Sequence, residues 1–113
     1  MNAYRADDRV LLLAIPAEQE LAALARILMR GIVVALGTAE EVAEARARFS
    51  EFANVMLLDA PPDRIPWRGA GFSKIVVPRQ YERILPQLAG ELDRLLAPGG
   101  EIVCKAGSFA LGL

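Results

Sequence analysis

The chain has 113 residues, 54% of them hydrophobic, with a mean hydropathy of +0.30 and a formal net charge of −1. This length fits a single domain over residues 1–113, and the near balance of charge excludes the basic excess that marks nucleic-acid-binding proteins. Histidine is absent and Cys104 is the only cysteine, which excludes serine–histidine and cysteine–histidine catalysis, histidine-based zinc sites and an internal disulfide. No apolar run is long enough to span a membrane and no signal-peptide pattern opens the sequence, so we expect a cytoplasmic protein without a metal, nucleic-acid or membrane partner.

The first half of the chain alternates continuous apolar runs with helical patterns. Such runs are typical of parallel strands that are buried on both faces. They cover residues 10–15, 32–36 and 55–58. Pro16 suits the turn into a first helix, which we expect to start at Ala17. Thr38 and Glu41 have the spacing of a capping box, which predicts the start of a second helix that ends near Asn54.

The second half adds a loop, two strands and two helices. Residues 60–71 contain three prolines and two glycines, which predicts a surface loop. The other predicted elements are strands over 72–77 and 101–105, a helical turn over 80–85, and a helix that starts at Pro86 and breaks at 98–100. The alternation of strands and helices predicts an α/β domain in which helices cover both faces of a mostly parallel sheet.

Two segments resemble motifs of the class I S-adenosylmethionine-dependent methyltransferases. Residues 95–103, LLAPGGEIV, are similar to the segment RvLkPGGxlv that leads into strand five of that family. Residues 58–72, which contain LDA, then IPW, then Phe72, resemble the family's run gDaxxlPfxxxxFD. The resemblance implies an open three-layer Rossmann-like sandwich with about five strands in the order 3-2-1-4-5, and S-adenosylmethionine as the cofactor. Beside this family the chain looks truncated, because strands six and seven have no counterpart before Leu113.

The cofactor motif of the family is the part that this sequence does not reproduce. The family has an acidic strand followed by GxGxG, and a second acid at the end of strand two that binds the ribose hydroxyls. Leu12 stands in place of the first acid, and Gly37 near that of the second. Neither side chain can accept a hydrogen bond, and a proline in the turn removes a backbone donor. The resemblance places the cofactor at these positions: Ala14, Pro16, Glu18, Thr38, Asp59, Ala60 and Pro78.

Several of these residues also have purely structural interpretations. Asp59 lies beside the adenine by resemblance, but it also suits the cap of the proline-rich loop that follows. Residues 79–81 (Arg, Gln, Tyr) face the transferred methyl group by resemblance, or form an ordinary strand-to-helix connection. Glu18 suits the positive end of a helix dipole. Trp67 forms a pocket wall or packs over the sheet edge, and we expect Cys104 to be a small buried hydrophobic residue.

These observations predict a methyltransferase-like domain that has lost the usual mode of S-adenosylmethionine binding and acts as a noncatalytic or regulatory homodimer. The dimer is expected because strand 101–105 would be an exposed edge, and such edges are usually covered. One alternative is a divergent S-adenosylmethionine-dependent methyltransferase that acts on a small molecule. Another is a receiver-like or small nucleotide-binding module, with Asp59 as the phosphoacceptor. No catalytic residue is assigned, and whether the chain is an enzyme stays open.

Overall fold

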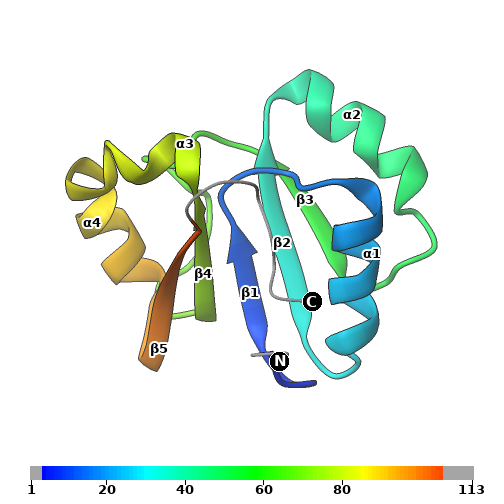
Figure 1. Ribbon diagram of the computed structural model, residues 1–113, viewed down its shortest axis with the longest axis horizontal. Coiled ribbons are helices and arrows are strands. Elements are labelled where there is room, and N and C mark those ends of the chain that lie inside the picture. Colours follow the sequence, from blue (N-terminus) through cyan, green and yellow to red (C-terminus); the bar gives the residue numbers. More distant parts are fainter. Residues whose placement is uncertain (1–3, 106–113) are drawn as a thin grey trace.

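The computed structural model describes residues 4–105, with Lys105 as backbone only. Five parallel strands form one sheet in the order β3-β2-β1-β4-β5 (Figure 1). The strands are β1 (Arg9–Leu12), β2 (Ile32–Gly37), β3 (Val55–Asp59), β4 (Phe72–Pro78) and β5 (Leu96–Lys105). The helices are α1 (Glu18–Ile27), α2 (Ala39–Arg48), α3 (Arg79–Glu82) and α4 (Leu85–Leu95). The predicted fold class and strand order are therefore confirmed. The receiver-like alternative is wrong, because that fold has the order 2-1-3-4-5.

The sheet has a hydrophobic core on each face, with α1 and α2 on one side and α4 on the other (Figure 1). Successive residues of β1 alternate between them: Val10 and Leu12 belong to the first core, and Leu11 belongs to the second. All three side chains are fully buried. A strand buried on both faces needs apolar residues at every position, which explains the continuous apolar run in the sequence.

The capping box at the start of α2 is present as predicted. The Thr38 hydroxyl accepts a hydrogen bond from the Glu41 N–H at 3.2 Å, and the Glu41 carboxylate accepts one from the Thr38 N–H at 2.8 Å. The helix ends at Arg48, earlier than expected. Asn54 has a different role, because its side-chain amide donates to the Ala25 and Leu28 carbonyls, both at 2.8 Å. It thereby satisfies carbonyls at the end of α1 that have no partner within the helix.

The first and last strands differ in extent from the prediction. β1 ends at Leu12 rather than at residue 15. β5 starts at Leu96 rather than at Glu101, because the PGG segment runs beside β4 with an irregular register, and Gly99 takes a φ of +79°. The prediction for Cys104 is wrong, since this side chain is exposed. The second core includes leucines of α4 and residues of β1, β2 and β4, and it does not extend to Cys104.

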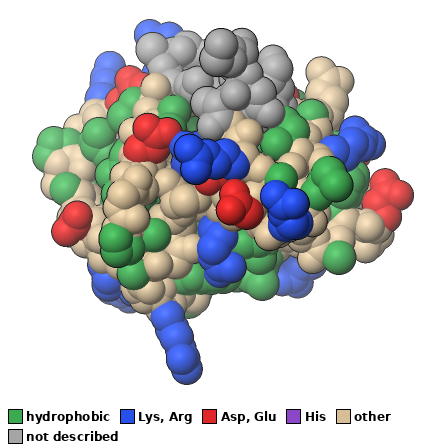
Figure 2. Space-filling model, turned by 90° about the horizontal axis from the view of Figure 1, so that it is seen from below, with side chains coloured by type: hydrophobic (Ala, Val, Ile, Leu, Met, Phe, Trp, Pro, Cys, Tyr) green, Lys and Arg blue, Asp and Glu red, His purple; other side chains and the backbone are tan. Residues whose placement is uncertain are grey.

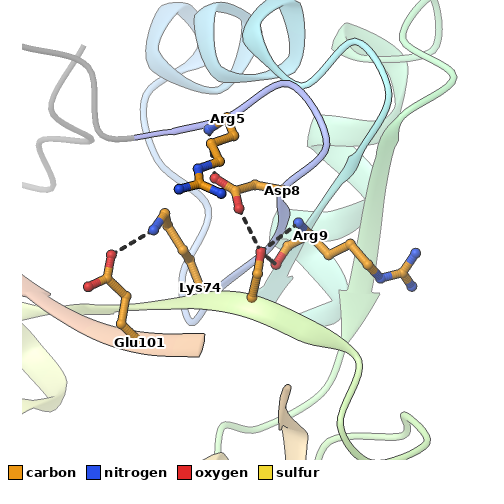
Figure 3. A network of polar contacts seen from close by, with 6 residues as sticks. Arg5, Asp8, Arg9, Lys74 and Glu101 are labelled. Atoms are coloured by element: carbon orange, nitrogen blue, oxygen red, sulfur yellow. Dashed lines mark hydrogen bonds and ion pairs between the residues drawn. The ribbon is translucent and has the colours of Figure 1, made fainter. Parts of the chain in front are cut away.

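Polar contacts join the amino ends of β1 and β4 and link β4 to the middle of β5 (Figure 3). The buried Asp8 carboxylate accepts hydrogen bonds from the Arg5 N–H at 2.7 Å and the Ser73 hydroxyl at 2.9 Å. The Ser73 oxygen in turn accepts from the Arg9 N–H at 3.0 Å. Ser73, which stands where the family motif has aspartate, therefore links β4 to the start of β1.

The pKa of Tyr4 is raised to about 12 at this end of the sheet. The main cause is burial, followed by the carboxylates of Asp8 and Glu101.

Gly90 provides a test of the helix α4. It lies in the exposed interior of this helix, and a Cβ built there has no atom within 4 Å. We expect Gly90→Ala to raise the free energy of unfolding by about 0.5 to 1 kcal/mol, because alanine loses less backbone entropy in a helix. Urea denaturation followed by circular dichroism measures this change.

The control is Gly31→Ala, at a position where a Cβ would lie 2.0 Å from the Asp8 carbonyl oxygen. This variant should be destabilised, because backbone must move to admit the methyl group. Equal stability of the Gly90→Ala variant and the wild type would contradict the assignment of Gly90 to a regular, open helix face.

Candidate functional site

A cleft of about 590 Å³ opens at the carboxyl ends of the strands. The segments after β1, β2 and β3 and the start of α3 surround it. Its lining residues are Leu13, Ala14, Leu36, Gly37, Thr38, Ala39, Glu41, Asp59, Ala60, Pro61, Pro62, Gln80 and Tyr81. Open parallel sheets bind their ligands in a crevice at this end, where the strand order reverses. The cleft is therefore the candidate functional site.

The structure brings together only part of the residue set expected from the sequence. Ala14, Thr38, Asp59 and Ala60 line the cleft, together with Gln80 and Tyr81. The other three expected residues lie elsewhere. Pro16 and Glu18 line a separate groove of about 160 Å³ beside α2, and Pro78 is buried at the junction of β4 and α3. The turn after β1 therefore contributes one of its three expected residues to the cleft.

Ile15 lies beside the end of β2 and lines the separate groove of about 160 Å³ rather than the cleft. A Cβ at Gly37 would lie 2.8 Å from the Ile15 Cδ1 atom and 3.2 Å from the nearest Glu41 carboxylate oxygen. A larger residue at position 37 would therefore require one of these neighbours to shift. The sequence pattern shows that an acid is missing at this strand end, but it does not show that an apolar side chain occupies the space beside it.

The polar side chains of the cleft differ in how they are used. Thr38 and Glu41 hydrogen-bond to each other's backbone N–H groups in the capping box. The Asp59 side chain is exposed at the end of β3 and accepts no hydrogen bond within residues 4–105, so it does not cap the loop that follows. Asp59, Gln80 and Tyr81 are thus the polar side chains of the cleft that take no part in the capping box, and they can offer hydrogen bonds to a ligand. Nowhere in residues 4–105 do three acidic or cysteine side chains gather into a group that could hold a metal ion.

The loop between β3 and β4, which forms one wall of the cleft, is fastened to α4. The Glu91 carboxylate accepts from the Ile65 N–H at 2.7 Å, and the Arg94 guanidinium donates to the Ile65 and Trp67 carbonyls at 3.0 and 2.7 Å. Trp67 packs on Phe72 with ring centroids 5.0 Å apart, so it belongs to the second core and not to the cleft. The hydrogen bond from Arg94 and, after it, that from the Ile65 N–H hold the pKa of Glu91 below its ordinary value.

The opposite end of the sheet has a second hollow of about 520 Å³, whose lining includes Arg5, Asp8, Arg9 and Ser73. Figure 2 shows this face, on which basic and acidic side chains are interspersed with apolar ones. Several of these charged groups are already engaged: Lys74 pairs with Glu101 at 2.6 Å, and Arg9 donates to the Gly71 carbonyl at 2.7 Å. A charged ligand is attracted by a patch of one sign, which this face lacks. Within residues 4–105, no helix is both long and apolar enough to cross a membrane.

Comparison with known proteins identifies the fold. No protein-family model and no curated protein matches the sequence. A SAM-dependent methyltransferase from Aquifex aeolicus matches with a TM-score of 0.75 and 21% identity, over 88% of this chain and 56% of that one. The fold is that of the class I methyltransferases.

Two further matches were solved with a product of the cofactor bound. PKMT2 from Rickettsia typhi, in complex with AdoHcy, has a TM-score of 0.74 at 15% identity, over 91% of this chain and 22% of that one. Coclaurine N-methyltransferase, bound to N-methylheliamine and SAH, has a TM-score of 0.73 at 15% identity, over 89% and 31%. The chain thus spans 22% to 56% of the length of these three structures. At such identities the likeness is one of fold.

The fastening of the cleft loop can be tested through pH. Because the folded-state pKa of Glu91 lies below its ordinary value of 4.5, the stability that this carboxylate contributes is present above that pH and is lost as the pH falls through the folded-state pKa. We expect Glu91→Gln to lower the free energy of unfolding at pH 7 by at most about 1 kcal/mol, since the pair is partly exposed. The variant should also lose less stability than the wild type below pH 4.5. Urea titrations from pH 7 to pH 3 measure both effects.

Glu44→Gln serves as the matched control. Glu44 forms an ion pair with Arg48 one helical turn away, at 2.6 Å, but its side chain is 67% exposed. Its removal should change stability by less than about 0.5 kcal/mol. A Glu91→Gln variant with the acid dependence of the wild type would contradict the inferred role of this carboxylate.

Proposed function

We propose that this chain is a methyltransferase-like domain that does not bind S-adenosylmethionine in the family's usual mode and acts as a noncatalytic or regulatory homodimeric module. The observation that carries the proposal is the contact between Ile15 and Gly37. A Cβ at Gly37, near which the resemblance implies a ribose-binding carboxylate, would lie 2.8 Å from the Ile15 Cδ1 atom.

Glu41 is the nearest carboxylate, but it does not replace the missing acid. Its Oε1 atom accepts the hydrogen bond from the Thr38 N–H that closes the capping box. In the capping box only the Oε1 atom of this carboxylate is engaged; to turn both oxygens toward a ribose, Glu41 would give up a capping interaction worth about 1 kcal/mol. The Ile15 side chain would still lie over Gly37.

The turn after β1 is also unfavourable for the usual cofactor mode. Glycines let a ligand approach the backbone closely, whereas Ala14 projects a methyl group into the cleft wall. Pro16 is buried and has no N–H to donate. Glu18 opens α1 with a negative charge, which would repel a ligand carboxylate near this helix terminus. These features support the proposal independently of the Ile15 contact.

One observation favours the second candidate function, a divergent methyltransferase that acts on a small molecule. The cleft keeps a volume of about 590 Å³, and Asp59, Gln80 and Tyr81 offer polar groups to it. The free carboxylate of Asp59 could accept hydrogen bonds from an amine or a hydroxyl of a ligand. In this case the cofactor would lie in the cleft without the ribose contact at β2.

Isothermal titration calorimetry with S-adenosylmethionine and S-adenosylhomocysteine separates the two candidates. We expect no saturable binding to the wild type below a dissociation constant of about 1 mM. The double variant Ile15→Ala, Gly37→Asp supplies both space and a carboxylate, and should bind S-adenosylhomocysteine at least about tenfold more tightly than the wild type. Gly37→Asp alone should gain less than the double variant, because the Ile15 Cδ1 end must first rotate away from the new side chain.

One outcome of this titration would support the second candidate function instead. Micromolar binding to the wild type that Asp59→Ala weakens by about tenfold or more would overturn the proposal and support the divergent enzyme.

A further inference from the structure

Within residues 4–105, the charged side chains that line the cleft are both acidic. They are Glu41 and Asp59, and the lining includes no lysine or arginine. The whole chain has 13 basic and 14 acidic residues, so this imbalance is a property of the cleft. The rest of the lining is largely apolar, with side chains from Leu13, Ala14, Leu36, Ala60, Pro61 and Pro62. Such a lining favours a ligand that has an apolar body and a positive charge.

Asp59 is the carboxylate that a ligand can reach without disturbing the fold. Its side chain is exposed at the end of β3 and makes no hydrogen bond or ion pair with the described part of the chain. Glu41 adds negative charge to the cleft, but its Oε1 atom accepts the capping hydrogen bond from the Thr38 N–H at 2.8 Å. An ammonium group beside Asp59 would therefore gain a charge-assisted hydrogen bond without breaking one that the fold uses.

Tyr81 gives the same cleft an aromatic wall. The side chain is half-buried and packs against the second core, so the ring is held in place where it lines the cleft. The face of an aromatic ring attracts a cation that lies within about 6 Å of its centre. Gln80 adds an amide oxygen, which can accept a hydrogen bond from an N–H group. A free carboxylate, a ring and an amide oxygen are all groups that suit an ammonium ion.

Two features near the cleft would instead attract an anion. The amino terminus of α2 carries a partial positive charge, but its first turn contains Glu40 and Glu41, which offset that charge. Three exposed arginines, Arg64, Arg79 and Arg83, lie within two residues of the lining in the sequence, but none of them lines the cleft. Because exposed charges are screened by salt, the residues of the lining decide the preference.

We propose that the cleft binds a small organic ammonium ion, whose charged group is held by the Asp59 carboxylate and the Tyr81 ring. This inference rests on the proposed function, because a cleft that does not take S-adenosylmethionine in the usual mode is open to another ligand. The apolar body of the ion would lie against the leucines and prolines of the lining. A carboxylate or a phosphate would find no basic side chain in this lining to pair with.

Three probes with the same apolar body test the charge preference in titrations followed by amide NMR. Phenethylammonium is positively charged, phenethyl alcohol is neutral and hydrocinnamate is negatively charged. We expect phenethylammonium to shift the amides of Asp59, Gln80 and Tyr81, and to bind at least about tenfold more tightly than hydrocinnamate. The proposal is overturned if hydrocinnamate or the alcohol binds as tightly as the cation. It is also overturned if the cation gives no saturable shift of these amides below a dissociation constant of about 50 mM.

The variant Asp59→Asn keeps the shape of the side chain and removes its charge. It should weaken the binding of phenethylammonium by at least about threefold and leave that of the alcohol unchanged. Asp93→Asn is the matched control, because Asp93 is an exposed acid on α4 that does not line the cleft. It changes the net charge of the protein equally and should leave both affinities as in the wild type. An equal loss in the two variants would point to a general charge effect and contradict the Asp59 contact.

Two substitutions of Tyr81 separate the ring from its hydroxyl group. Tyr81→Phe keeps the ring and should retain most of the affinity for phenethylammonium, whereas Tyr81→Leu should lose at least about twofold more. Circular dichroism checks that each variant is folded. Equal affinities of the folded Phe and Leu variants would contradict the role of the ring, and the Asp59→Asn variant decides the charge preference in either case.

The ammonium site and the proposed function can fail independently of each other. Micromolar binding of S-adenosylhomocysteine to the wild type would overturn the proposed function, whatever the three probes show. Binding of hydrocinnamate as tight as that of phenethylammonium would overturn the ammonium site, whether or not S-adenosylhomocysteine binds.

Discussion

The structure depends on one strand, β1, which is buried on both faces and hydrogen-bonded on both edges. Its partners are β2 and β4, and its side chains enter both cores. The position of every other element follows from this strand, because α1 and α2 pack on one side of it and α4 on the other. Such a strand must stay apolar whether or not a ligand binds at its end. Packing therefore preserves β1, while it places much weaker demands on the turn that follows.

The residues of the turn after β1 show what these weaker packing demands permit. Ile15 lies over Gly37 and contributes to the packing around the first core. Pro16 is buried, and Glu18 opens α1 with the charge that a helix amino terminus favours. Pro16 and Glu18 serve the stability of the fold at positions where the resemblance implies glycines of a cofactor turn, and Ile15 lies between two such positions. Under the proposed function, local stability and cofactor binding compete at this turn, because packing side chains stand where glycines would let a ligand approach the backbone.

Most of the fold could be predicted from the sequence because its signals are local. Apolar runs, helical periodicity and the Thr38–Glu41 spacing each report on the residues that they contain. The contacts of the Asn54 amide with α1, and those of Glu91 and Arg94 with Ile65, could not be predicted. Each of them joins segments more than twenty residues apart. The prediction that Cys104 is buried was wrong for the same reason, because its burial depends on which strands α4 covers.

The candidate site was less predictable than the fold. Resemblance located the strand ends that form the cleft, but it could not say which side chains at those ends are free. Thr38 is committed to a helix cap, whereas Asp59 is open at the end of β3. The cleft thus has unengaged acceptor and amide groups on its β3 and α3 sides, whereas the polar side chains on its β2 side, Thr38 and Glu41, take part in the capping box. A ligand that suits it would interact with Asp59, Gln80 and Tyr81 and would need no contact with a carboxylate at the end of β2. Under the proposed function, this distribution of polar groups and the missing carboxylate at β2 together disfavour the family's usual mode of cofactor binding.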